Sequence, residues 1–273
     1  MAELTGKRAL VTGASSGIGA AIARDLSARG ASLVLTARRK DQLDAVAAEC
    51  RATSATVEVI TADLGQAGAA AALWAAATAG GPIEICVNNA GFGYFRPFGE
   101  VEQARDAELM QLNITSLVEL SRWFVAARKG ETGRAYLLNI ASIGAYQSVP
   151  NMALYAASKA FVRNFTEAIH DELRRTAASA TCVCPGGTET EFHAQAGAGN
   201  YGWVANASMM SAESCATLAV RAMLKGKRTY IPGLVNKLSC FGVRFVPRRF
   251  ASWMARRVLG KPRPGALPPR SAA

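Results

Sequence analysis

Short apolar runs alternate with longer amphipathic stretches along most of the chain. Each apolar run is closed by a glycine, an asparagine or a charged residue, which is typical of strands buried on both faces of a parallel sheet. The pattern predicts strands at residues 8–12, 32–36, 56–61, 83–88, 134–140, 180–184 and 229–231. It predicts helices at residues 17–29, 40–51, 67–78, 103–128, 153–176 and 212–225. This alternation predicts one α/β domain over residues 1–233, a doubly wound parallel sheet of seven strands with helices on both faces.

The pattern changes after residue 233. Residues 234–260 place apolar side chains at helical spacing with arginines among them, and Pro247 is expected to divide the segment into two helices. This composition is typical of a basic amphipathic helix on an anionic membrane surface. It is equally typical of a helix that packs on the domain or covers a binding pocket, since periodicity cannot distinguish a lipid-facing stripe from a core-facing one. Residues 261–273 contain four prolines and are expected to be disordered.

The net charge of +11 is distributed unevenly along the chain. Residues 221–273 hold 13 Lys and Arg and no acidic residue, whereas residues 1–220 carry 18 basic and 20 acidic residues. The main body is therefore not expected to bind nucleic acid. No export signal is recognisable and no apolar run approaches the roughly 20 residues of a spanning helix, so a cytoplasmic location is expected. Peripheral contact with the inner face of a membrane, through residues 236–260, remains an alternative.

The six cysteines are scattered along the chain. Only Cys182 and Cys184 lie close together, and neither a zinc-ligand spacing nor a histidine cluster accompanies them. We expect reduced, buried thiols and no metal site.

The loop after the first predicted strand is rich in glycine. Gly13 permits a tight turn, Gly17 lets the backbone approach a pyrophosphate, and Gly19 allows helix and strand to pack closely. The following helix offers free N–H groups and the positive end of its dipole to an anion. This arrangement predicts a Rossmann-like dinucleotide site, although a glycine-rich turn without a ligand has the same composition. The predicted contacts are Gly13, Ser15, Ser16, Gly17, Ile18 and Gly19.

The end of the second predicted strand bears on the choice of dinucleotide. Folds that prefer NAD usually carry an acid here to hold the ribose hydroxyls. This chain has Ala37 there, followed by Arg38 and Arg39. Guanidinium groups suit a 2′-phosphate, so the sequence favours NADP(H). The alternative is a solvated basic pair at the end of a strand.

Tyr155 and Lys159 lie four residues apart in a predicted helix and therefore share one of its faces. A lysine cation beside a phenol is expected to lower the pKa of the tyrosine, which would suit Tyr155 as general acid and base for carbonyl reduction and alcohol oxidation. Ser142, after the fifth predicted strand, is placed to hydrogen-bond a substrate oxygen. A tyrosine–lysine pair alone is common by chance, so the remaining motifs decide its meaning.

Together with Asn88-Asn89-Ala90-Gly91, Asn113 and Pro185-Gly186, these motifs resemble the short-chain dehydrogenase/reductase family in order and spacing over about Lys7 to Ile231. The resemblance implies an active enzyme, with NADP(H) as cofactor, and a homodimer or homotetramer. It implies the catalytic residues Asn113, Ser142, Tyr155 and Lys159. It implies further cofactor contacts at Asp63, Leu64, Asn89, Ala90, Gly91, Tyr155, Lys159, Pro185, Gly186 and Thr188.

The resemblance also implies individual roles. Asn89 would brace the cofactor loop and Asp63 would lie by the adenine. Asn113 would hold a water in a proton relay through Lys159, which would also bind the nicotinamide ribose. Thr188 would contact the nicotinamide carboxamide.

The substrate side is less specific. Residues 187–212 form a long predicted loop, which in the family covers the substrate. The proposed substrate contacts are Ser142, Tyr146, Phe92, Tyr94 and Phe192, with Val149, Pro150, Tyr201 and Trp203 as further candidates. Each of these apolar residues could equally pack in the core or at an oligomer contact.

The apolar bias predicts a hydrophobic ketone or aldehyde and the corresponding alcohol as substrates. A β-ketoacyl thioester reductase is the alternative within the same chemistry. A non-catalytic NADP(H)-binding sensor at a membrane is the alternative of another class, and the complete set of proton-transfer residues argues against it.

Overall fold

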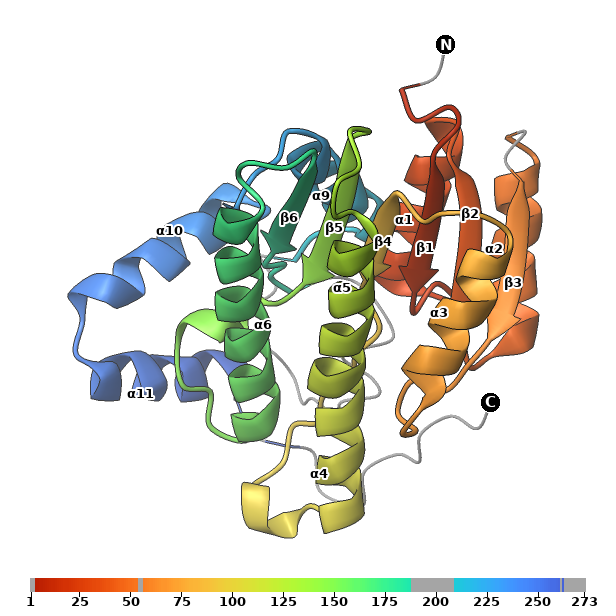
Figure 1. Ribbon diagram of the computed structural model, residues 1–273. Coiled ribbons are helices and arrows are strands. Elements are labelled where there is room, and N and C mark those ends of the chain that lie inside the picture. The colour runs from red at the N-terminus through yellow and green to blue at the C-terminus, as the bar shows by residue number, and fades with distance from the viewer. Residues whose placement is uncertain (1–2, 54–55, 188–208, 261, 263–273) are drawn as a thin grey trace.

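A computed structural model describes residues 3–53, 56–187, 209–260 and 262 of the chain. Seven strands form one sheet in the order β3-β2-β1-β4-β5-β6-β7, and every neighbouring pair is parallel (Figure 1). The strands are β1 (Arg8–Thr12), β2 (Ser32–Ala37), β3 (Val57–Thr61), β4 (Ile85–Asn88), β5 (Ala135–Ile140), β6 (Ala178–Val183) and β7 (Thr229–Tyr230). The predicted doubly wound sheet of seven strands is confirmed.

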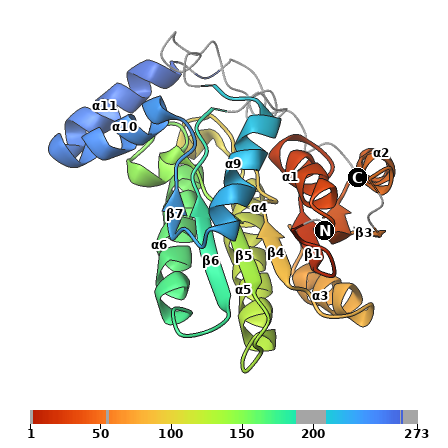
Figure 2. The same ribbon diagram turned by 90° about the horizontal axis from the view of Figure 1, so that it is seen from above.

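Helices cover both faces of the sheet (Figure 2). The helices of one face are α1 (Gly17–Ala28), α2 (Lys40–Arg51) and α9 (Ala212–Leu224). The helices of the other face are α3 (Ala69–Ala79), α5 (Ser116–Ala127) and α6 (Ala153–Glu172). Three further helices are α4 (Gln103–Met110), α10 (Leu234–Gly242) and α11 (Arg248–Leu259).

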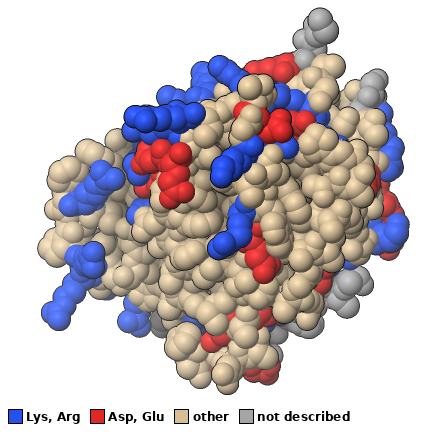
Figure 3. Space-filling view, in the orientation of Figure 1, with Lys and Arg blue, Asp and Glu red and all other residues tan. Residues whose placement is uncertain are grey.

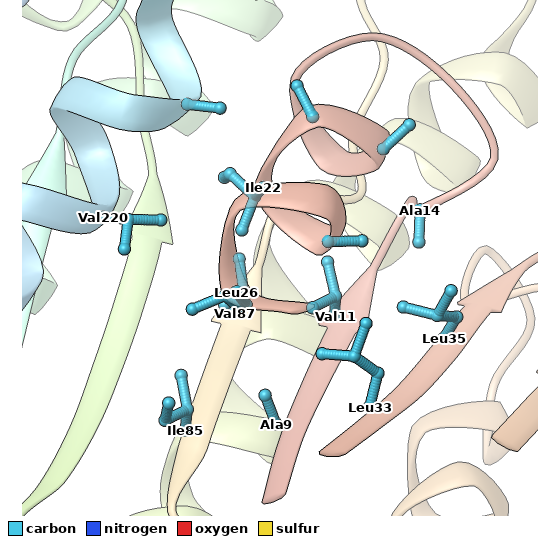
Figure 4. Packing of buried hydrophobic residues seen from close by; sticks show 14 of the residues in the cluster. Ala9, Val11, Ala14, Ile22, Leu26, Leu33, Leu35, Ile85, Val87 and Val220 are labelled. Atoms are coloured by element: carbon cyan, nitrogen blue, oxygen red, sulfur yellow. The ribbon is translucent and has the colours of Figure 1, made fainter. Parts of the chain in front are cut away.

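Alternation along the strands sends side chains to opposite cores. Val11 of β1 packs toward α1, whereas its neighbour Leu10 packs toward the helices of the other face. Figure 4 shows Ile22 and Leu26 of α1 in one cluster with side chains of the strands, among them Val11 and Val87. Each such fully buried side chain contributes roughly 1.5–3 kcal/mol. This packing holds α1 on β1 and so fixes the glycine loop that joins them.

The helix predicted over residues 103–128 is present, but it contains a π-helical turn that the apolar spacing did not predict. This turn, Gln111–Thr115, joins α4 to α5, and Asn113 lies within it. A π turn adds one residue to a helical turn and occurs often at functional sites. Here it coincides with the hydrogen bonds that tie the Asn113 side chain to the loop after β4.

The C-terminal segment forms two helices, as predicted. A 3-10 turn, Val243–Phe245, follows α10, and Pro247 directly precedes α11. Both helices project from the edge of the molecule beyond β6 and α6 (Figures 1 and 2). Within the described ranges, no helix combines the length and apolarity needed to cross a bilayer.

All six cysteines are free and buried. No group of three or more His, Cys, Asp or Glu side chains suited to a metal ion occurs among the described residues.

Candidate active site

A cavity of about 700 Å³ opens at the carboxyl ends of the strands. Parallel α/β sheets bind ligands at this edge. One part of the cavity is lined by the glycine loop and the ends of β2 and β4. The other part is lined by the end of β5, by α6, and by α10 and α11.

Gly13 and Gly19 of the loop after β1 leave no room for a Cβ atom. Gly13 has φ 66° and Gly17 has φ 56°, conformations that favour glycine. A Cβ atom at Gly13 would lie 2.8 Å from Asn89 Nδ2, and one at Gly19 would collide with the carbonyl oxygen of Gly13. The loop therefore packs directly on α1 and on the segment after β4, and Gly13 and Gly17 line the cavity.

Asn89 and Thr12 fasten this loop. Asn89 Nδ2 donates to the carbonyl oxygens of Thr12 (3.0 Å) and Gly13 (3.2 Å). The Thr12 hydroxyl accepts from the backbone N–H groups of Asn89 and Ala90 and donates to the carbonyl of Val87. Sequence reasoning missed Thr12. The sequence feature that could have revealed its role is a hydroxyl residue at the end of an otherwise apolar buried strand.

The two arginines after β2 lie beside the loop. Arg39 donates to Ser16 Oγ over 2.8 Å and to Ser15 Oγ over 3.4 Å. Burial lowers the pKa of Arg38, and nearby Asp63 opposes that shift. Arg38, Arg39 and Asp63 all line the cavity, as Leu64 does. This end of the cavity therefore concentrates positive charge next to the N-terminus of α1.

Three elements position the predicted catalytic residues: the end of β5, α6 and the π turn. Ser142 follows β5, Tyr155 and Lys159 lie one turn apart on α6, and all three line the cavity. Ser142 Oγ accepts from the backbone N–H of Gly144 over 3.1 Å. Lys159 Nζ lies 5.8 Å from the centre of the Tyr155 ring. Asn113, in the π turn, is buried behind the cavity wall.

Lys159 is an unusual lysine because it is buried. Its Nζ donates to the carbonyl of Ile140 over 2.9 Å. Removal from water lowers its pKa to about 8, although the nearby thiols of Cys182 and Cys184 act in the opposite direction. The ammonium group can therefore exchange its proton near neutral pH.

Asn113 and Lys159 converge on Gly91. A Cβ atom at Gly91 would lie 3.0 Å from Asn113 Oδ1 and 3.3 Å from Lys159 Nζ. The Asn113 carboxamide is held on both sides, since Nδ2 donates to the Phe92 carbonyl (2.9 Å) and Oδ1 accepts from the Phe92 N–H (3.1 Å). Nδ2 also lies 3.2 Å from Ser158 Oγ. Gly91 thus leaves a gap between two polar groups of fixed position.

A buried network of polar side chains links α6 to β4 and β5. Asn88 Nδ2 donates to Asn139 Oδ1 (2.9 Å) and to Ser121 Oγ (3.0 Å). Asn139 Nδ2 in turn donates to Thr166 Oγ1 of α6 (2.9 Å). Buried amides whose hydrogen bonds are satisfied rigidify their surroundings. Sequence reasoning assigned no role to Asn139, because a single asparagine in an apolar strand does not reveal its partners.

The predicted substrate contacts separate into two groups. Phe92, Tyr146 and Val149 line the cavity, and the Arg163 guanidinium lies 4.4 Å from the centre of the Tyr146 ring. Tyr94 requires a correction: it is absent from the described lining residues, its side chain is buried, and its hydroxyl donates to Asp106. The aromatic character of Tyr94 serves the packing of α4 on the loop after β4. Pro150 is also absent from the described lining residues.

Several predictions fall outside the described residues. They concern Thr188, Phe192, Tyr201, Trp203, almost all of the loop at 187–212, and the tail at 261–273.

The C-terminal helices close the apolar end of the cavity. Residues of α10 and α11 that line it include Val235, Phe250, Met254 and Val258. Of the alternatives for this segment, the structure thus shows a helix pair that packs on the domain and covers the pocket. Sequence reasoning did not place these residues at the cavity, because their spacing suits a lipid-facing stripe equally well.

The Pro-Gly turn after β6 meets α10 directly. A Cβ atom at Gly186 would collide with the carboxamide of Asn236, which is buried and donates to the carbonyl of Pro232. Pro185 and Gly186 both line the cavity. The close fit at Gly186 therefore joins the C-terminal helices to the cavity floor.

The fold and the glycine loop define a Rossmann-like nucleotide-binding protein with a tyrosine and a lysine at its cavity. Residues 7–200 match the family model described as short chain dehydrogenase. A presumed ketoacyl reductase of Streptomyces coelicolor is 36% identical over 200 residues, covering 71% of this chain and 75% of that protein. The chain therefore belongs to the short-chain dehydrogenase family of oxidoreductases.

Solved structures agree with this assignment. A short-chain dehydrogenase from Sphingobium yanoikuyae in complex with NADPH is 31% identical, with a TM-score of 0.77 over 88% of this chain and 94% of that one. A bulky-bulky ketone specific alcohol dehydrogenase from Comamonas testosteroni is 29% identical, with a TM-score of 0.72 over 92% of each chain.

Proposed function

We propose that this protein is an NADP(H)-dependent oxidoreductase that interconverts a hydrophobic ketone or aldehyde and the corresponding alcohol. The observation that carries the proposal is the meeting of Ser142, Tyr155 and Lys159 at one cavity whose far end is apolar. Polar groups for proton transfer at one end and an apolar wall at the other suit a carbonyl compound with a large apolar substituent.

The residues present fit NADP(H). The glycine loop lines the cavity directly before the N-terminus of α1, where free N–H groups suit a pyrophosphate. Arg38 and Arg39 place positive charge beside Ser15 and Ser16, which suits a 2′-phosphate. The relative from Sphingobium yanoikuyae was solved with NADPH, which supports the same choice. When bound, the nicotinamide supplies hydride exchange with the substrate carbon.

The protein's own residues then handle the proton. The hydroxyls of Ser142 and Tyr155 hydrogen-bond the carbonyl oxygen, and Tyr155 donates its proton as negative charge develops there. Lys159, with a pKa of about 8, can replace that proton. The convergence of Asn113 and Lys159 on Gly91 supports a relay through a water held by Asn113.

A second candidate is reduction of a β-ketoacyl thioester. The 36% identity to a presumed ketoacyl reductase favours it. The catalytic chemistry would be unchanged, and the apolar wall formed by α10 and α11 would hold the acyl chain. The third hypothesis, a sensor without turnover, does not explain why Lys159 is buried or why Lys159 and Asn113 converge on Gly91.

The test is NADPH oxidation with ketones, aldehydes and β-ketoacyl thioesters of increasing chain length, with NADH in parallel. We expect kcat/KM to rise with the length of the apolar chain and to be higher with NADPH. Thioester turnover that exceeds turnover of the matched simple ketones would select the second candidate. Tyr155→Phe should retain NADPH binding and lose at least about a thousandfold in kcat. Retained turnover in this variant, or none in wild-type protein that binds NADPH, would overturn the proposal.

A further inference from the structure

The outer surface of α10 and α11 is apolar to an unusual degree. Of the eleven large hydrophobic side chains that are exposed in the described part of the chain, eight lie between Leu234 and Met254. Five of these eight do not line the cavity: Leu234, Leu238, Phe241, Phe245 and Trp253. Leu234 and Phe245 are each 72% exposed and Trp253 is 49% exposed. Soluble proteins rarely leave such groups together in water unless the surface binds something.

These five side chains lie on the outer faces of the two helices and of the turn between them. On α10, Leu234, Leu238 and Phe241 recur at intervals of four and three residues, while Asn236 and Cys240 are buried. The stripe continues through Phe245, whose ring lies 5.0 Å from that of Phe241. The exposed row is therefore continuous from the start of α10 into the turn that follows it.

The second helix repeats the arrangement. On α11, Ala251 and Ala255 are buried, whereas Trp253 is exposed beside Phe250, with 5.7 Å between the ring centres. The Arg257 guanidinium lies 5.1 Å from the centre of the Trp253 ring. Tryptophan and arginine each combine an apolar body with a polar tip, which suits the boundary of water and lipid.

Positive charge surrounds these apolar groups. The exposed basic residues of the segment are Lys237, Arg244, Arg248, Arg249, Arg256 and Arg257. No acidic residue follows Glu213 in the whole sequence. In the space-filling view, the lobe on the left that α10 and α11 form shows basic and uncharged surface (Figure 3).

The positive charge of this surface favours an anionic bilayer over a second copy of the chain as its binding partner. A second copy of the chain, docked through the same segment, would bring six cations against six with no acidic residue to pair them. An anionic bilayer supplies both an apolar phase for the side chains and negative headgroups for the cations. We propose that the outer surface of α10 and α11 docks on the surface of an anionic lipid bilayer.

The first measurement is co-sedimentation of the full-length protein with vesicles. We expect binding to vesicles of phosphatidylcholine mixed with phosphatidylglycerol, much weaker binding to phosphatidylcholine alone, and loss of binding as salt is raised. Absence of binding to the anionic vesicles would overturn the proposal. This readout requires no turnover, so it fails or succeeds independently of the proposed reaction.

A charge-reversal pair identifies the surface. The double variant Arg248→Glu with Arg249→Glu alters two exposed cations that do not line the cavity. Since each cation near an anionic surface contributes about a fivefold factor in affinity, the variant should bind at least about 25-fold more weakly. The matched control, Arg174→Glu with Arg175→Glu, makes the same change at exposed positions after α6 and should retain wild-type binding. Equal losses in both variants would overturn the assignment.

Trp253 reports which side faces the lipid. We expect brominated lipids to quench tryptophan fluorescence in the wild type and to quench it less in Trp253→Phe. Leu238→Ser with Phe241→Ser should weaken vesicle binding without changing its salt dependence, since it removes apolar area alone. A dimer in light scattering that these substitutions dissociate, together with no vesicle binding, would instead establish a second copy as the occupant.

Discussion

Burial of Lys159 connects the proton chemistry of the site to the stability of the fold. The lysine keeps its charge at neutral pH only against the cost of leaving water, and its pKa falls to about 8 for that reason. The same burial brings Nζ to Gly91, which Asn113 Oδ1 also approaches, and to the Tyr155 ring, where a proton donor is useful. The folded state therefore carries a destabilising charge at the position where the proposed reaction uses it.

The pH dependence of stability tests this account. Between pH 8 and 10.5 the unfolded lysine remains protonated while the folded lysine loses its proton, so rising pH favours the folded state. We expect the free energy of unfolding of cofactor-free wild type to gain up to about 3 kcal/mol over Lys159→Met across this range. Urea denaturation at several pH values measures the difference. Lys129→Met, at an exposed lysine, should show a difference that does not vary with pH.

Arg38 and Arg39 allow a test of cofactor choice. Arg38→Ala removes a half-buried cation at the cavity, where a hydrogen bond to a charged group is worth about 1.5–3 kcal/mol. We expect the Kd for NADPH to rise by about 10- to 100-fold and the Kd for NADH to change by less than about threefold. Fluorescence titration of both cofactors measures this, with Lys40→Ala as the exposed neighbouring control. Equal losses for the two cofactors would remove the role of Arg38 in binding a 2′-phosphate.

The helices and strands differ in how far the sequence determined them. The sheet was predictable because each buried strand is a short apolar run and each connecting helix is amphipathic. The π turn around Asn113 was not, since one extra residue leaves the apolar spacing of residues 103–128 helical. The position of Tyr94 was not predictable either, because an aromatic residue beside a motif can face the core or the cavity.

The π turn should be held in place largely by one side chain. Asn113→Ala would leave the backbone N–H and carbonyl of Phe92 without their partner, at a cost of about 1–3 kcal/mol for each buried group that stays unpaired. We expect a loss of this size in urea denaturation and a kcat lowered by about tenfold or more. Ser158→Ala removes only a secondary neighbour of Asn113 Nδ2 and should cost less than about 1 kcal/mol. A similar loss in both variants would assign the stability to the helix rather than to the link with Phe92.

The whole molecule combines a family-typical body with a C-terminal segment that has two separate surfaces. The family match ends at residue 200, yet α10 and α11 supply the apolar end of the cavity. Their inner residues contact the space that the substrate would fill, and their outer residues carry the exposed apolar stripe and the cations. Six of the 13 Lys and Arg residues that follow position 220 lie in residues 234–260, the segment that closes the cavity.

Docking by α10 and α11 would bring the cavity wall to the bilayer. A substrate dissolved in lipid could then enter the cavity directly from the membrane, whereas a water-soluble substrate enters from solution in either case. We expect anionic vesicles to lower the apparent KM for a long-chain ketone and to leave that of a short-chain ketone unchanged. Arg248→Glu with Arg249→Glu should abolish the effect while kcat on the short-chain ketone stays at the wild-type value, because neither arginine lines the cavity. Steady-state NADPH oxidation with and without vesicles measures both quantities. A KM that falls equally for short and long ketones, or that still falls in the variant, would contradict this link between membrane docking and substrate entry. If α10 and α11 serve both, loss of docking must also remove the effect of vesicles on KM.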